Sequence, residues 1–221
     1  MRCVSGLLVV ALAGSVASAT ELVDFSFANA AGVFVADTSG GGTFSIDAVS
    51  ASPFETLMSV SAVIPPLGDA DFDAGFVAGG SSADLSISLN VAPSGTDATG
   101  TITITDADGD TLTADITGTF DFGTPGAVFF NAALADGNLN DVSAGNSDFN
   151  GSSSGSFPLS ALSDNDVDGA FSMLFPRSGT ADIFGSSFSD TPVLGNGFLV
   201  PAPGSAALLA LGGLAAVRRR R

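Results

Sequence analysis

The sequence predicts an all-β fold, and we expect a single antiparallel β-sandwich of the jelly-roll or a similar type, with a closed β-barrel as the alternative. Apolar residues alternate with small polar ones over many short segments. Clusters of Gly, Ser and Asp separate these segments at intervals of roughly ten residues. Only residues 127–135 offer a doubtful helical stretch in the interior. The sandwich is preferred because a transmembrane barrel carries girdles of Tyr and Trp, and the chain has neither.

The N-terminus has the form of an export signal. Arg2 precedes the apolar run 4–16, and Ala17-Ser18-Ala19 has the small-x-small form that signal peptidase cleaves. We therefore expect a helical signal peptide over residues 1–19 and a mature chain that begins at Thr20. Cleavage would remove Cys3, the one cysteine, which excludes disulfides and cysteine chemistry from the mature chain.

Residues 20–199 are expected to form one acidic β domain that is large enough to bury a core. A hairpin is the clearest unit within it. Residues 101–105 and 111–117 alternate throughout and are joined by residues 106–110, so their threonines should face solvent. Further half-buried strands are predicted around Phe25 and Phe27, Phe44 and Ile46, and Leu85, Ile87, Leu89 and Val91.

The charge of this domain excludes several functions. Arg177 is its only basic residue, against 23 acidic residues, and the chain contains no lysine or histidine. Such a surface repels nucleic acid and anionic membranes. A Ser-His-Asp triad, a lysine nucleophile and a His-ligated zinc site are excluded because their residues are missing. We expect a protein that is not an enzyme.

Two acidic clusters are candidate calcium sites. The hairpin turn holds three carboxylates, and residues 164–169 form the opening half of an EF-hand-type loop with Gly169 at the sharp turn. That loop lacks its twelfth-position carboxylate, because Phe175 stands there. The alternative for each cluster is a plain solvated turn. The candidate ligands are Asp106, Asp108 and Asp110 in the first cluster, and Asp164, Asp166 and Asp168 in the second.

The C-terminal tail, residues 200–221, has three parts: a Val-Pro-Ala-Pro motif, an apolar run over 206–217 and four arginines. A helix over the run would be roughly 20 Å long at about 1.5 Å per residue, which is short for a hydrocarbon core of ~30 Å. It would form a marginal membrane helix, with the arginines on the cytoplasmic face.

This tail resembles the PEP-CTERM sorting signal of bacterial envelope proteins, which consists of a Val-Pro-Glu-Pro motif, a short membrane helix and an arginine cluster. Ala202 departs from the motif, because it stands where the glutamate is usual. The resemblance implies a Gram-negative-type bacterium, processing by the membrane protease exosortase, and exopolysaccharide as a partner. The alternative is a plain tail anchor. The matching positions are Val200, Pro201 and Pro203 in the motif, and Arg218, Arg219, Arg220 and Arg221 in the cluster.

These observations predict an exported protein of the cell envelope or extracellular matrix with a structural or adhesive role, anchored in the inner membrane by its C-terminal helix before processing. A calcium-dependent polysaccharide-binding module is the first alternative. A glycoside hydrolase is the second, since it needs only two carboxylates about 5 to 10 Å apart. Sugar sites usually offer aromatic platforms as well, and here the strand alternation assigns the phenylalanines to the core.

Overall fold

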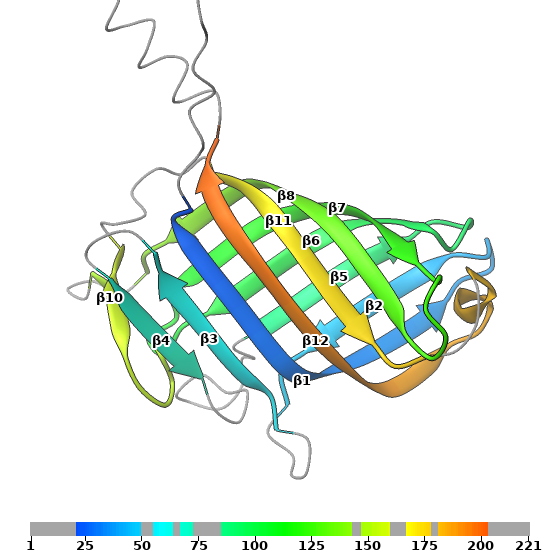
Figure 1. The fold of residues 1–221 in the computed structure, drawn as a ribbon, viewed down its shortest axis with the longest axis horizontal. Helices are drawn as coiled ribbons and strands as arrows, with labels where there is room; N and C mark the ends of the chain where they lie inside the picture. The colour runs from blue at the N-terminus through cyan, green and yellow to red at the C-terminus, as the bar shows by residue number, and fades with distance from the viewer. Residues whose placement is uncertain are drawn as a thin grey trace, which may run out of the picture.

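The computed structural model describes residues 21–49, 55–63, 67–72, 85–142, 147–159, 167–177 and 181–202. The all-β prediction is confirmed (Figure 1). The elements are β1 (Val23–Ala36), β2 (Gly42–Asp47), β3 (Leu57–Ala62), β4 (Gly68–Phe72), β5 (Leu85–Val91), β6 (Asp97–Thr105), β7 (Thr111–Asp121), β8 (Val128–Asn140), β9 (Asp148–Asn150), β10 (Ser156–Pro158), β11 (Val167–Phe175), the 3-10 helix η2 (Ala181–Gly185) and β12 (Phe188–Pro201).

Eight of the strands close into an antiparallel barrel in the order β1-β2-β5-β6-β7-β8-β11-β12, and β12 pairs back onto β1. The preferred sandwich is therefore not confirmed, and the closed barrel, which was the alternative, describes the sheet. Closure depends on β1, whose ladder with β12 shifts register after Phe27 and again after Gly32. Such bulges bend and twist a strand, which lets the sheet curve until its edges meet.

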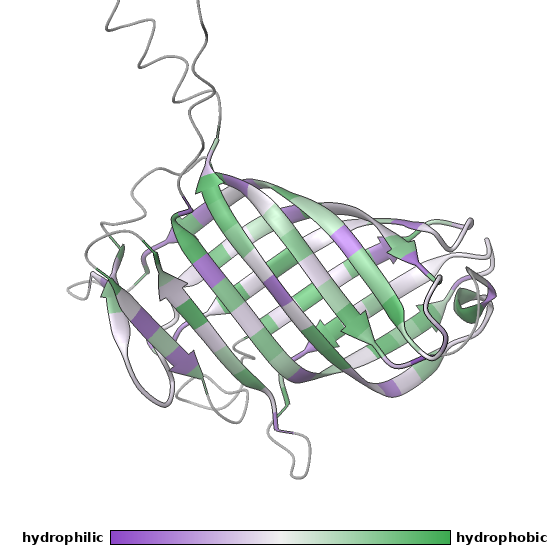
Figure 2. Ribbon diagram, viewed as in Figure 1, coloured by the Kyte–Doolittle hydropathy of each residue, from purple (hydrophilic) through white to green (hydrophobic). Residues whose placement is uncertain are grey.

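The predicted hairpin is confirmed as β6 and β7, with Thr105 opposite Thr111. The predicted strands around Phe25, Phe44 and Leu85 are confirmed as β1, β2 and β5. Along these strands the apolar residues point into the barrel and the small polar residues point out, as the alternating bands of Figure 2 show.

Phenylalanines fill the barrel and close one of its ends. Phe184 of η2 is buried at that end, with ring centroids 4.9 Å from Phe34 and 4.7 Å from Phe120. Phe44 and Phe175 lie beside them, with their ring centroids 5.1 Å apart. The interior of the barrel at this end is therefore packed with aromatic rings.

At the other end, β1 pairs with β3 in place of β2, and β3 carries β4 at its outer edge. The β9–β10 hairpin links this extension to the rest of the barrel. Its turn bridges Asp71 of β4 to Ser154, while the backbone amide of Asn150 bonds to Asp106 in the β6–β7 turn. Phe72, Phe149 and Phe157 pack beneath it, with centroids 6.2 and 5.3 Å apart for successive pairs.

The first and last described residues leave the same end of the barrel, side by side (Figure 1). The amide of Leu22 donates a hydrogen bond to the carbonyl of Leu199 at 2.8 Å. The predicted signal peptide, residues 1–19, and the predicted membrane helix, residues 206–217, lie outside the described residues. Within the described ranges, no helix has the length and apolar character needed to cross a membrane.

Candidate functional site

The predicted acidic cluster at 106–110 is a hydrogen-bonded turn between β6 and β7. Asp106 is fully buried, and its Oδ1 accepts the amides of Asp108 and Asp110 at 2.8 Å each. Its Oδ2 accepts the amide of Asn150 at 2.8 Å, and the Asn150 side chain donates to Asp108 at 3.0 Å. The turn thus ties the β6–β7 hairpin to β9.

This geometry favours the plain turn over a calcium site. Amide N–H groups point at both oxygens of Asp106, whereas a cation needs those oxygens as its own ligands. Asp110 is also occupied, since its Oδ1 accepts the amide of Val142 at 2.7 Å. In the part of the chain that the structure describes, no three His, Cys, Asp or Glu side chains gather as a metal site.

Burial raises the pKa of Asp106 above its ordinary value of 3.8, because the surrounding protein replaces the water that would solvate its charge. The amides of Asn150, Asp110 and Asp108 oppose this by stabilising the carboxylate, and the nearby charge of Asp110 adds to the rise. The carboxyl is therefore a structural acceptor whose charge is costly.

The second acidic cluster is described only in part. Asp164 and Asp166 lie outside the described residues, and half-buried Asp168 lies on β11, opposite Val200 of β12. Calcium at this loop stays a prediction.

The predicted sorting motif begins in β12, the last strand of the barrel. Val200 and Pro201 are the last residues of β12, where they pair with Asp168 and Val167 of β11, and Ala202 is buried beside them. Pro203 and the four arginines, Arg218 to Arg221, lie outside the described residues. The barrel therefore runs two residues past the expected domain boundary at 199.

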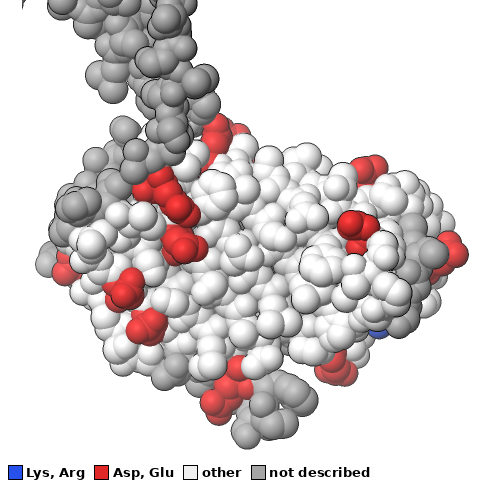
Figure 3. Space-filling model, in the orientation of Figure 1, with Lys and Arg blue, Asp and Glu red and all other residues white. Residues whose placement is uncertain are grey.

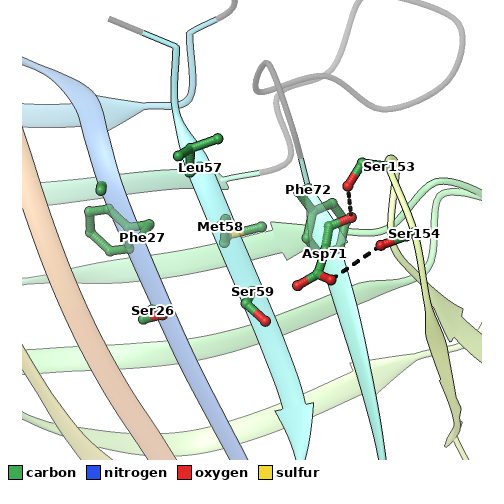
Figure 4. A pocket seen from close by; sticks show the side chains of 10 residues that line it. Ser26, Phe27, Leu57, Met58, Ser59, Asp71, Phe72, Ser153 and Ser154 are labelled. Atoms are coloured by element: carbon green, nitrogen blue, oxygen red, sulfur yellow. Dashed lines mark hydrogen bonds between the residues drawn. The ribbon is translucent and has the colours of Figure 1, made fainter.

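A pocket of about 500 Å³ lies on the outer surface of β1, β3 and β4 (Figure 4). Ser26, Ser59 and Asp71 face it from three adjacent strands, and exposed Leu57 contributes an apolar wall. Ser153 and Ser154 form its far rim, with their hydroxyls donating to the Asp71 carbonyl at 3.0 Å and to its Oδ2 at 3.2 Å. The pocket combines hydroxyls, one carboxylate and apolar groups, a set that suits a polyhydroxylated ligand.

No family model, no characterised protein and no solved structure matches the chain.

The pocket on β1, β3 and β4 was not predicted from the sequence. Its residues come from β1, β3, β4 and the turn between β9 and β10, which are separated by up to 128 positions between Ser26 and Ser154. No local motif marks them, because serines at alternate strand positions occur throughout the chain. Only the register of β1 with β3, and of β3 with β4, brings them together.

Proposed function

We propose that this chain is an exported envelope or matrix protein, delivered by its tail to an exosortase-type protease, in which the barrel is a non-enzymatic structural or adhesive domain. The observation that carries the proposal is the junction of barrel and tail. β12, which closes the barrel against β1, runs directly into the Val-Pro-Ala-Pro motif. The proposed sorting signal thus directly follows β12, the strand that closes the barrel.

The position of the ends supports the same proposal. The predicted signal peptidase site after Ala19 lies three residues before Leu22, which is hydrogen-bonded to β12 next to the tail. Both predicted processing events would take place at one end of the barrel, and the rest of its surface would remain available to partners.

Intact mass spectrometry of the protein recovered from its own envelope and medium tests this proposal. We expect a chain that begins at Thr20 and ends at or after Ala202, because a cut before Pro201 would remove paired residues of β12. A variant that lacks Arg218 to Arg221 is the control, and it should accumulate with its tail intact. A native protein that retains residues 206–221 would contradict exosortase processing and would support a plain tail anchor.

The calcium-dependent alternative is tested separately. If residues 164–168 bind calcium in the folded state only, 10 mM calcium raises the thermal midpoint, since a ligand that binds only the native state stabilises it. Asp164→Asn with Asp166→Asn should abolish the rise, whereas Asp108→Asn should not. An unchanged midpoint for the parent protein would sink the calcium proposal.

A further inference from the structure

One row of polar side chains crosses the outer surface of the barrel and its β3–β4 extension. Each member lies directly opposite the next on the neighbouring strand, so all of them share the outer face. Neighbouring strands lie about 4.8 Å apart, so the row presents a polar group at each such interval. We call it the polar row; its members, from β4 to β6, are Asp71, Ser59, Ser26, Asn196, Ser172, Asn131, Thr119 and Asp97.

The polar row begins in the pocket. Asp71, Ser59 and Ser26 face the pocket, and Asn196 of β12 follows them on the next strand. Farther on, the hydroxyl of Ser172 donates to Oδ1 of Asn131 at 3.0 Å, which leaves the amide NH₂ of Asn131 to donate outward. The pocket and the row therefore form one continuous surface that offers both donors and acceptors.

Large apolar side chains flank the row on β12. Phe198 and Leu194 lie two residues on either side of Asn196 and are 38% and 43% exposed. Phe198 is thus a phenylalanine that does not belong to the core. Its exposed ring, next to a line of hydroxyl and amide groups, offers the apolar platform on which the C–H face of a sugar ring packs.

The charge of this face restricts the ligand. In the view of Figure 3 the middle of this face carries no Lys, Arg, Asp or Glu side chain. Acidic side chains lie around it: Asp71 and Asp97 at the two ends of the row, and exposed Asp24 directly opposite Phe198. Arg177, the only basic residue between residues 20 and 199, lies over the ring of Phe188, 3.8 Å from its centroid, and away from this row. An anionic polymer would meet repulsion here and no cation.

We infer that the pocket and the polar row bind an uncharged polysaccharide, whose chain runs across β1, β12, β11 and β8 with a sugar ring on Phe198. The inference rests on the proposed function in that it names the ligand class for the adhesive role. Hydrogen bonds from the row would orient the sugar hydroxyls, and Phe198 and Leu194 would contribute apolar contact. No calcium ion is needed, because the side chains themselves supply the donors and acceptors.

The test measures retention of the full-length chain, purified in mild detergent, on amorphous cellulose and in galactomannan gels, with alginate gels as the anionic comparison. We expect retention on at least one neutral polymer and none by alginate, with no loss when EDTA is added. Asn196→Ala with Ser172→Ala should weaken binding by about tenfold or more, because two hydrogen-bonding groups are removed. Phe198→Ala should weaken it by a similar factor.

The matched control is Thr99→Ala with Thr101→Ala on the outer face of β6, which stands opposite β12 in the barrel. This pair also removes two exposed polar side chains, and its binding should equal that of the parent. Thermal melts of all variants verify folding, and Phe198→Ser replaces Phe198→Ala if that variant does not fold. Three results would overturn the inference. The parent protein could bind neither neutral polymer, it could be retained more strongly by alginate, or the two double variants could lose binding equally. The proposed function is tested by the intact mass of the native protein, which does not depend on any of these binding results. A failure of this inference is therefore distinguishable from a failure of the proposed function.

Discussion

At the scale of single residues, Asp106 is the side chain that stabilises the end of the barrel where the β6–β7 turn meets β9. It accepts three backbone amides, from Asp108, Asp110 and Asn150. Asp106→Ala would leave one buried and two part-buried amide donors without their acceptor, and a lost partner of this kind costs about 1–3 kcal/mol when the donor is buried. We expect the free energy of unfolding in urea to fall by about 3 kcal/mol or more.

Asp115→Ala is the control for this substitution, because Asp115 is exposed on the outer face of the same hairpin. Exposed substitutions of this type usually stay within about 0.5 kcal/mol. Equal stability of the two variants would show that the amides find other acceptors, and it would contradict the structural role given to Asp106.

The raised pKa of Asp106 predicts a pH dependence with a definite sign. The folded state holds the proton more tightly than the unfolded state, since burial raises the folded pKa above 3.8. The contribution of this group to stability is therefore present at low pH and is lost as pH rises from 3.8 through the raised pKa. Carbon-13 NMR should place the carboxyl midpoint above 3.8, and a midpoint at or below that value would contradict the prediction.

The residue scale also shows what the sequence predicts and what it cannot. The pattern Asp-Ala-Asp-Gly-Asp predicts a turn at residues 106–110, and the structure confirms it. That Asp106 is buried depends on Asn150, which arrives from 44 positions away. Phe198 illustrates the same limit, since the alternation predicts that a phenylalanine faces the core, whereas the register of β12 places this one outside.

At the scale of elements, the seam between β1 and β12 pairs aromatic residues with glycines. Phe25 lies opposite Gly197, and Phe27 lies opposite Gly195. Their rings cover the glycines so closely that a Cβ on Gly197 would lie 2.8 Å from the carbonyl oxygen of Ala170 and closer still to the ring of Phe25. The two strands approach because neither glycine has a side chain.

Gly197→Val should therefore destabilise the barrel by about 2 kcal/mol or more, as overpacked sites do. Gly185→Ala in η2 is the matched control, because its added Cβ would meet no atom within 4 Å. Urea denaturation of both variants measures the difference. A Gly197→Val variant as stable as the control would mean that the seam is looser than the structure has it.

Elements with strict alternation were predictable, because one period identifies both the strand and its buried face. β5, β6 and β7 are of this kind. Residues 127–135 were not, because their alanines suit a helix as well as a strand, and pairing with β7 and β11 decides for β8. The short strands β9 and β10 were not predicted either, because contacts with β4 and with the β6–β7 turn stabilise them.

At the scale of the whole molecule, closure depends on the last strand. A chain that ends at Ala202 keeps all pairs of β12 with β1 and β11. It should show the same thermal midpoint as the full chain. A chain that ends at Gly195 loses the pairs from Val23 to Ser26 and the bond between Leu22 and Leu199, so it should melt at a lower temperature or fail to fold. Equal midpoints for the two truncated chains would contradict this account of closure.

The local sequence pattern does not decide whether the whole molecule is a sandwich or a barrel. Both architectures use the same alternation of inward apolar and outward polar residues. What separates them is whether β12 returns to β1, a pairing across 154 to 176 positions in the sequence. The absence of Tyr and Trp, used to prefer the sandwich, concerns contact with lipid and has no bearing on whether a sheet closes around a phenylalanine core.

The pairing of the first strand with the last also sets an order in time. β1 is made first, yet one of its edges has no partner until β12 is complete. An exported chain would thus cross the membrane with that edge open, and open edges invite pairing with other chains. If the tail enters the membrane as proposed, it would keep the chain from leaving until β12 has emerged and can pair with β1. Holding the chain at that moment would give the barrel time to close before the protein is released.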